Sequence, residues 1–328
     1  MKRPNLPPSD QQSRVSVVMP AYNVAAYIGA ALASVAAQTW PRIEMIVVDD
    51  GSTDGTGDEV EGQRGAWSTP NRTLTLIRQD NRGAAAARNT GMAQATGDYI
   101  ALYDADDLCH PTLMSRQVAT LEADPALDLA FALYHYIDAD GTRLATQTAP
   151  ASDRLGTYDI LCDNVVHSPL FRAEAARAVG PLDESLRAHI DLDFFTRITQ
   201  RRAKSIGVVP EALSDYRRRP DQITGDWRRM RENWQRVHAK LVADGMELTE
   251  MQERRMLARL RLYWATLAYQ TDDLANARRL AFEALRHDPG GVLADPHGRV
   301  RLLACAASLL PRAAHDRLRD WYNARGAA

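Results

Sequence analysis

The sequence predicts an α/β protein with a mostly parallel sheet, followed by an all-helical region. Between residues 15 and 103, short apolar runs alternate with longer helical patterns, as in βαβ units. From Trp227 onward strand patterns end, and apolar residues recur at helical spacing to about Tyr322. We therefore expect a flexible N-terminus (1–14), an α/β unit (15–225) and a helical unit (226–328).

The composition excludes several kinds of protein. With 45% hydrophobic and 25% charged residues, the chain has the make-up of an ordinary globular protein. The formal net charge of −2 creates no field that would gather nucleic acid, so we expect no nucleic-acid partner. No run approaches the roughly 18 to 20 apolar residues of a membrane span, and the basic N-terminus lacks the apolar stretch of a signal peptide.

The cysteines indicate a reducing compartment. Cys109, Cys162 and Cys305 form no CxxC pair and are too few for a disulfide framework or a zinc site. We therefore expect a cytoplasmic protein that is either unattached or peripheral to the inner face of the membrane.

Four strands and three helices are expected in the first 107 residues. Each strand run is rich in Val, Ile, Leu or Tyr and ends in polar or turn residues. The runs are VSVVMP (15–20), IEMIVVDD (43–50), LTLIRQD (74–80) and DYIALYDADD (98–107). The helices lie between them at 23–38, from near Asp54, and at 83–95.

The pattern continues with a smaller set of elements up to the helical unit. We expect a helix at about 111–124, a strand at about 128–138, a surface loop at 141–156, a helix that begins near Leu186 or Asp191, and a short strand at 206–209. In the helical unit, residues 263–289 resemble one tetratricopeptide helix pair. A simple antiparallel helix hairpin is equally compatible, because a stable solenoid needs about three repeats.

Acidic residues follow three of the predicted strands. They are Asp49 and Asp50, then Asp80, then Asp104, Asp106 and Asp107. Ligands of open parallel sheets bind outside the carboxyl ends of the strands. Carboxylates crowded there repel one another unless a cation or donor groups compensate, so this edge is the expected site.

Asp104 and Asp106 are separated by a single residue, which allows both carboxylates to approach one hard cation. Mg²⁺ or Mn²⁺ held by one or two carboxylates completes its coordination with water and phosphate oxygens. The alternative is that these aspartates only cap the helix that begins near His110.

Four motifs in order carry a resemblance to a known family. They are PAYN (20–23), VVDDGSTDGT (47–56), NRGAAAARNTG (81–91) and ATGDYIALYDADD (95–107). In this order and spacing they resemble the family 2 glycosyltransferases of the GT-A fold, which is Rossmann-like with a mostly parallel sheet. The resemblance continues through SPLFRAEAARAVGPLDESLR (168–187) to about residue 220 and leaves the helical unit outside.

The resemblance implies a donor site for a nucleotide-sugar, most simply a UDP-sugar. Pro20, Ala21 and Tyr22 would line the base, and Asp50 or Asp49 would accept the pyrimidine N–H, as a carboxylate can. Without the other motifs, the same residues would be interpreted as an ordinary turn after a strand. The remaining implied residues are Gly83 and Arg88 beside the ribose and phosphates, Asp104 and Ala105 at the ribose or the metal, and Asp106 on the metal.

The resemblance also implies a general base. In LRAHIDLDFFTRI (186–198), Asp191 aligns with the family's base, although Ile190 replaces the glutamate that usually precedes it. Asp193 is two residues further along and faces another side of the helix, so the two carboxylates cannot both point into the site. The alternative is that Asp191 caps the helix and Asp193 is a surface residue. His189 is a third candidate, because the unperturbed pKa of histidine is close to neutrality.

YRRRPDQIT (216–224) resembles the family's closing segment, with Arg219 where a histidine is common. Its arginines could fold over a diphosphate as a lid, or form a solvated basic linker.

The expected activity is inverting, metal-dependent transfer of a hexosyl group to a hydroxyl of a glycan or lipid-linked saccharide, as in polysaccharide biosynthesis. Two rivals remain. A sugar nucleotidyltransferase would need a glycine-rich basic loop where this chain has PAYNVAAY (20–27). The second rival is a scaffold that has lost catalytic activity and binds partners through its helical unit. For that unit we consider three roles: homo-oligomerisation, partner binding and membrane contact.

Overall fold

The structure, a computed structural model, describes residues 13–67, 69–163, 165–219, 225–294, 296–307 and 316–317. Most of the expected N-terminal extension (1–12) and the end of the basic segment (220–224) lie outside the described residues.

A ten-stranded sheet forms the first part of the molecule, in the order β3-β2-β1-β4-β9-β6-β10-β5, with β7 beside β6 and β8 beside β10. The six strands β1 to β4, β6 and β10 run in one direction, and the short strands β5, β7, β8 and β9 run against their neighbours. The α/β fold with a mostly parallel sheet is therefore confirmed. The strands are β1 (Val15–Ala21), β2 (Ile43–Asp49), β3 (Arg72–Arg78), β4 (Tyr99–Leu102), β5 (Leu108–Cys109), β6 (Leu129–Ile137), β7 (Arg143–Thr146), β8 (Arg154–Leu155), β9 (Leu170–Arg172) and β10 (Ile206–Arg217).

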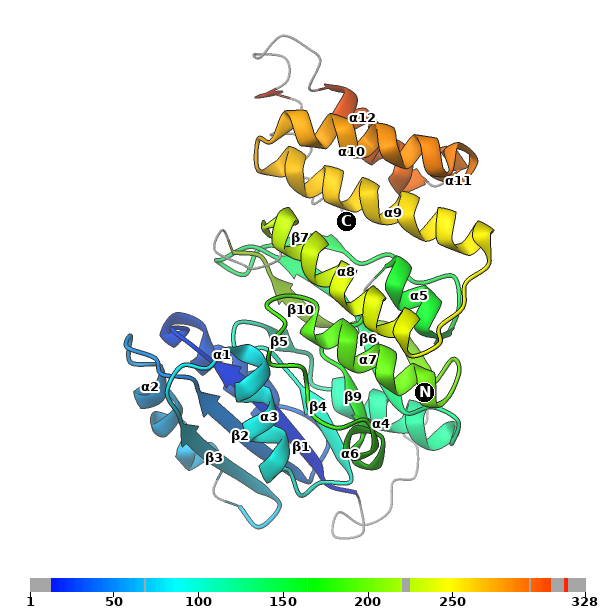
Figure 1. The fold of residues 1–328 in the computed structure, drawn as a ribbon. Helices are drawn as coiled ribbons and strands as arrows, with labels where there is room; N and C mark the ends of the chain where they lie inside the picture. The colour runs from blue at the N-terminus through cyan, green and yellow to red at the C-terminus, as the bar shows by residue number, and fades with distance from the viewer. Residues whose placement is uncertain are drawn as a thin grey trace.

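Helices cover both faces of the sheet, and further helices follow it (Figure 1). Those of the first part are α1 (Ala25–Ala36), α2 (Thr56–Gly62), the 3₁₀ turn η1 (Arg64–Trp67), α3 (Ala84–Gln94), α4 (Leu113–Ala123), α5 (Thr157–Cys162), α6 (Ala173–Val179) and α7 (Ile190–Arg201). Those of the second part are α8 (Trp227–Ala243), α9 (Glu250–Gln270), α10 (Leu274–His287), α11 (Pro289–Ala294) and α12 (Pro296–Ala307).

The alternation of side chains along β1 divides the core into two layers. Val17 and Met19 pack with α1 and α4 on one face, whereas Val18 packs on the other face with α3 and α7. Successive residues of a strand point to opposite faces, so a strand buried on both sides is apolar throughout. This is why the run VSVVMP is almost continuously apolar and does not alternate between apolar and polar residues.

Two expectations about the sheet were incomplete. The strand expected at 206–209 continues to Arg217, and the loop expected at 141–156 contains β7 and β8. Pro210 lies where the register of β10 against β6 shifts, between Val209 and Ala212. Proline cannot donate to the ladder, but a bulge accommodates it and the strand resumes.

The helical unit packs directly on the α/β unit. Trp234 of α8 belongs to the same buried cluster as Phe171 of β9 and Phe194 of α7, and its ring meets Trp264 of α9 edge to face at 5.9 Å. Figure 1 shows α8 between α7 and α9. Helices α9 and α10 form the hairpin that both interpretations of 263–289 share. Within the described residues, none of the helices has the length and apolarity of a membrane span.

The contact between α3 and β1 leaves no room for a side chain at Gly91. A Cβ there would lie 2.4 Å from Cγ1 of Val18. We expect Gly91→Ala to lower the free energy of unfolding by about 1–3 kcal/mol, as overpacking does, and urea titration measures it. Gly62→Ala is the control, because a Cβ at Gly62 of α2 meets nothing within 4 Å. Equal stability of the two variants would contradict this packing.

Candidate active site

The carboxylates after β2 organise the loop that follows β3. Asp50 is 3% exposed, and its two oxygens accept hydrogen bonds from Gln79 Nε2 (2.7 Å), Arg82 N (3.0 Å) and Gly83 N (2.8 Å). Asp49 Oδ1 accepts from Ser52 N at 2.9 Å. Asp50 therefore shapes the loop at the entry of α3, where Gly83 adopts a φ of 92° that favours glycine.

The end of β1 lies beside these aspartates. Pro20 and Ala21 pair in register with Val48 and Asp49 of β2, and Asp50 N donates to Ala21 O at 2.8 Å. Tyr22, the next residue, leaves 52% of its surface exposed. An exposed aromatic ring beside a carboxylate pair can stack on a base.

Arg88 of α3 links the carboxylates that follow β4 to those at the start of α7. Its Nη2 donates to Asp104 Oδ1 at 2.6 Å, and its side chain is only 17% exposed. Burial lowers the pKa of Arg88, but the charges of Asp104, Asp191 and Asp106 outweigh it and raise that pKa. For Asp104, burial raises the pKa, but Arg88 and His167 prevail and lower it. Arg88 is thus a largely buried cation that pairs with the acidic loop after β4.

Asp104 also belongs to a group that could hold a metal ion. One ligand atom each from Asp104, Asp107 and His167 lies within 4.8 Å of the others. His167 Nε2 is 2.8 Å from Asp107 Oδ2. Two carboxylates and an imidazole are donors that Mn²⁺ accepts, so these residues fit the metal that the sequence led us to expect.

Asp106 lies in a different environment from its neighbours. Its Oδ2 forms an ion pair with Arg219 Nε at 2.9 Å. Burial beside Asp107 and Asp104 raises the pKa of Asp106 to about 7. Its role as a metal ligand, expected from the sequence, remains a prediction, and Ala105 between the two aspartates is buried.

Arg217 has neither of the two roles expected for the basic segment. It is 6% exposed at the end of β10, where its backbone N–H donates to Asp107 Oδ1 (2.7 Å) and its Nε to the carbonyl of Asp106 (2.8 Å). It therefore supports the acidic loop. Arg218 lies over the ring of Tyr136, 4.1 Å from its centroid.

Asp191 occupies the first turn of α7, near enough to Arg88 and His189 to influence the pKa of both. Burial lowers the pKa of His189, and Asp191 opposes that effect. Ile190, in the place of the family's glutamate, is 8% exposed within the apolar core. Asp193 is not a surface residue: it is 2% exposed and paired with Lys240 and Arg197.

Sequence reasoning did not single out Asp107, His167 or Arg217 as site residues. Asp107 was counted among the acidic residues after the fourth strand, but no role was assigned to it. His167 directly precedes Ser168, and no sequence motif around it indicates a site. Arg217 was missed because its segment was interpreted as a lid or a linker.

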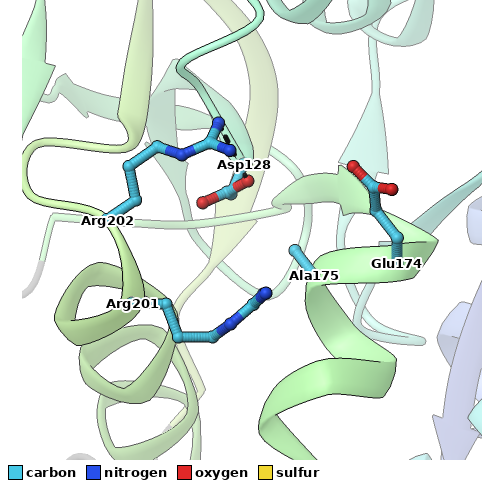
Figure 2. A pocket seen from close by; sticks show the side chains of 5 residues that line it. All are labelled: Asp128, Glu174, Ala175, Arg201 and Arg202. Atoms are coloured by element: carbon cyan, nitrogen blue, oxygen red, sulfur yellow. Dashed lines mark ion pairs between the residues drawn. The ribbon is translucent and has the colours of Figure 1, made fainter.

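A cavity of about 300 Å³ lies elsewhere (Figure 2). It is lined by Asp128, Glu174, Ala175, Arg201 and Arg202, with an ion pair of 3.5 Å between Asp128 and Arg202. Asp128 precedes β6, so the cavity is at the amino end of that strand. The acidic cluster lies at the opposite, carboxyl edge of the sheet.

The mostly parallel sheet, with the acidic cluster at its carboxyl edge, has the GT-A fold. The structure of S. aureus TarS 1-349 in complex with UDP-GlcNAc matches with a TM-score of 0.60 and 18% identity, over 94% of this chain and 91% of that one. Mannosyltransferase PcManGT from Pyrobaculum calidifontis, in complex with GDP-Man and Mn²⁺, matches with a TM-score of 0.60 and 22% identity, over 98% and 86%. At these identities the likeness establishes the fold.

The chain belongs to glycosyl transferase family 2, whose family model matches residues 16–180. TuaG of Bacillus subtilis (strain 168), provisionally named a teichuronic acid biosynthesis glycosyltransferase, is 29% identical over 222 residues, or 67% of this chain and 85% of TuaG. The uncharacterized glycosyltransferase alr2836 of Nostoc sp. (strain PCC 7120 / SAG 25.82 / UTEX 2576) is 32% identical over 180 residues. The chain spans only 54% of the length of that relative.

Proposed function

We propose that this glycosyltransferase moves a hexosyl group from a nucleotide-diphosphate sugar, most simply a UDP-sugar, to a hydroxyl of a glycan or lipid-linked saccharide, with inversion. The observation that carries the proposal is that Arg88 joins Asp104 at 2.6 Å and interacts electrostatically with Asp191. One buried cation thus connects the acidic loop after β4 to the helix that would supply the base. The UDP-GlcNAc in TarS and the teichuronic acid in the name of TuaG support the donor and a polysaccharide product.

The donor would lie along the carboxyl edge of the sheet. Tyr22, with Pro20 and Ala21, would contact the base, and the Asp49–Asp50 pair would accept its N–H. The loop that Asp50 holds would place Gly83 against the donor, and Arg88 would face the phosphates. Asp191, the proposed general base, would lie on α7 near Arg88.

Asp191 would act as the general base. Its carboxylate takes the proton of the acceptor hydroxyl while that oxygen bonds to the anomeric carbon, and the bond from that carbon to the diphosphate oxygen breaks. A single displacement inverts the anomeric centre. Ile190 keeps this end of α7 anchored in the apolar core, because it packs there instead of presenting a second carboxylate.

Asp104, Asp107 and His167 would hold a Mn²⁺ or Mg²⁺ ion, with Asp106 as the alternative to Asp107 that the sequence suggests. When bound, such an ion supplies positive charge for the departing diphosphate. The oxygen-rich donor set suits either ion, and PcManGT was solved with Mn²⁺.

We propose that residues 15–225 form the catalytic unit and that residues 226–328 form a helical unit with further contacts to a second copy or to the membrane. The thiols of Cys109 and Cys162 are free and buried, which fits a reducing compartment, so we propose the cytoplasm as the location.

A panel of UDP-, TDP- and GDP-sugars with Mn²⁺, scored for slow donor hydrolysis, tests the proposal without knowledge of the acceptor. We expect one UDP-sugar to be hydrolysed. Synthesis of a nucleotide-sugar from UTP and a sugar 1-phosphate would point instead to a nucleotidyltransferase. Donor binding without hydrolysis, with or without saccharide acceptors, would indicate a decayed scaffold.

A further inference from the structure

Helix α8 presents a polar stripe to the segment that leads into α7. Asn233, Arg236 and Lys240 are spaced by three and four residues, so they share one face of the helix. The apolar residues of α8 form a second stripe that is buried in the core: Trp227, Met230, Trp234, Val237 and Leu241. The polar stripe is therefore held at a constant position against the α/β unit.

Each residue of the stripe binds the segment 183–187 or α7. Asn233 Oδ1 accepts from Arg187 N at 2.9 Å, and Asn233 is 4% exposed. Arg236 donates to the carbonyl (3.0 Å) and hydroxyl (2.9 Å) oxygens of Ser185. Lys240 Nζ bridges Asp183 Oδ2 (2.9 Å) and Asp193 Oδ1 (2.5 Å). Lys240 thus ties the segment and α7 together.

The same segment, with Leu182 before it, is also bound by the loop that precedes α3 and by α3 itself. Arg82 Nη2 donates to Glu184 Oε2 at 2.9 Å, and the Asn89 side chain bonds to both the N–H (2.8 Å) and the carbonyl (3.0 Å) of Leu182. Asn89 is the residue after Arg88. Leu182 and the segment 183–187 are therefore hydrogen-bonded both to the expected donor site and to α8, the first helix of the helical unit.

We propose that Lys240 is a positioning residue of the transfer reaction, which it serves by fixing α7 and hence Asp191 relative to the donor; this rests on the proposed role of Asp191 as base. Asp193 is one half turn from Asp191 on the same rigid helix. A shift of α7 against α8 would move both carboxylates together. Through the bond of Lys240 to Asp193, α8 of the helical unit would complete the catalytic geometry.

The charges around Lys240 support this role. Burial lowers the pKa of Lys240, but its hydrogen bonds to Asp193 and Asp183 raise it, so the ammonium stays charged at neutral pH. Asp193 also has Arg197, whose Nη2 is 3.0 Å from Asp193 Oδ2. Asp193 thus keeps one cation when Lys240 is replaced, and the variant is expected to fold.

Lys240→Met in the full chain tests the proposal. We expect kcat for transfer, or for donor hydrolysis, to fall by about 10- to 100-fold, because a small misplacement of a reacting group has that effect. KM for the donor and the Kd of UDP should change less than about twofold, since the variant leaves Asp50 and Arg88 in place. Lys240→Arg, which preserves the charge, should recover most of the rate.

Arg228→Met is the matched control on the same helix. Arg228 forms an ion pair of 2.6 Å with Asp273 at the start of α10 and lies over the ring of Trp227, so its contacts here are with the helical unit. We expect it to lower Tm without lowering kcat at a temperature well below both transitions. In an Asp191→Asn background, Lys240→Met should cause little further loss of rate, because the group that it positions is already absent.

Three results would overturn the proposal: unchanged kcat in folded Lys240→Met, an equal loss of kcat in Arg228→Met, or a full additional loss in the Asp191→Asn background. Failure of the underlying function has a different signature. In that case Asp191→Asn itself would retain the rate.

Discussion

We expect Asp191→Asn to lower the rate of sugar transfer by about 100- to 10,000-fold, the usual contribution of a general base, and to leave the Kd of the UDP-sugar unchanged. The reason is geometric: Arg88 donates a hydrogen bond to Asp104, so this link between α3 and the acidic loop remains when Asp191 is replaced. The amide keeps the size of the side chain and removes its ability to take a proton. Single-turnover transfer with a saturating donor, together with calorimetry of donor binding, measures both quantities.

His189→Asn is the control for this prediction. His189 has a φ of 55°, and asparagine tolerates that left-handed conformation better than most residues. We expect the variant to retain most of the rate, because burial lowers the pKa of His189 and its Nε2 is enclosed. A loss as large as that of Asp191→Asn would assign the base role to His189, and an equal loss of donor binding in Asp191→Asn would mean a structural role.

The second large effect is expected on metal removal. Chelation with EDTA should reduce transfer to background and Mn²⁺ should restore it, because a divalent ion would offset the charge of a departing diphosphate. Mn²⁺ with UDP should also raise Tm by mass action, since ligand binds only the folded chain. His167→Gln and Asp104→Asn should each abolish the Tm shift.

Asp106→Asn distinguishes the two ligand sets. If Asp104, Asp107 and His167 hold the ion, Asp106→Asn should still release heat when Mn²⁺ is added. The same variant should stabilise the metal-free protein, because it removes one carboxylate from the crowded loop. If Asp106 is the ligand, the heat disappears in Asp106→Asn and persists in His167→Gln. Isothermal titration with Mn²⁺ alone reads out either result.

The local sequence pattern was sufficient to predict most of the fold. The first four strands and their helices were predicted because apolar periodicity and turn residues act over a few positions. The length of β10 was missed, because Pro210 is a strand terminator in local terms and only pairing with β6 carries the strand past it. The two-residue strand β8 exists only through its partner β10 and has too few residues for a pattern of its own.

For the site, the sequence by itself determined which carboxylates follow which strands, and ordered motifs identified the family. Only the tertiary structure decided which charges meet. His167 reaches Asp107 across 60 residues of chain, and Lys240 reaches Asp193 across 47. Such pairs depend on how β9, α7 and α8 pack, and the packing energy is shared among many residues, so no single stretch of sequence records it.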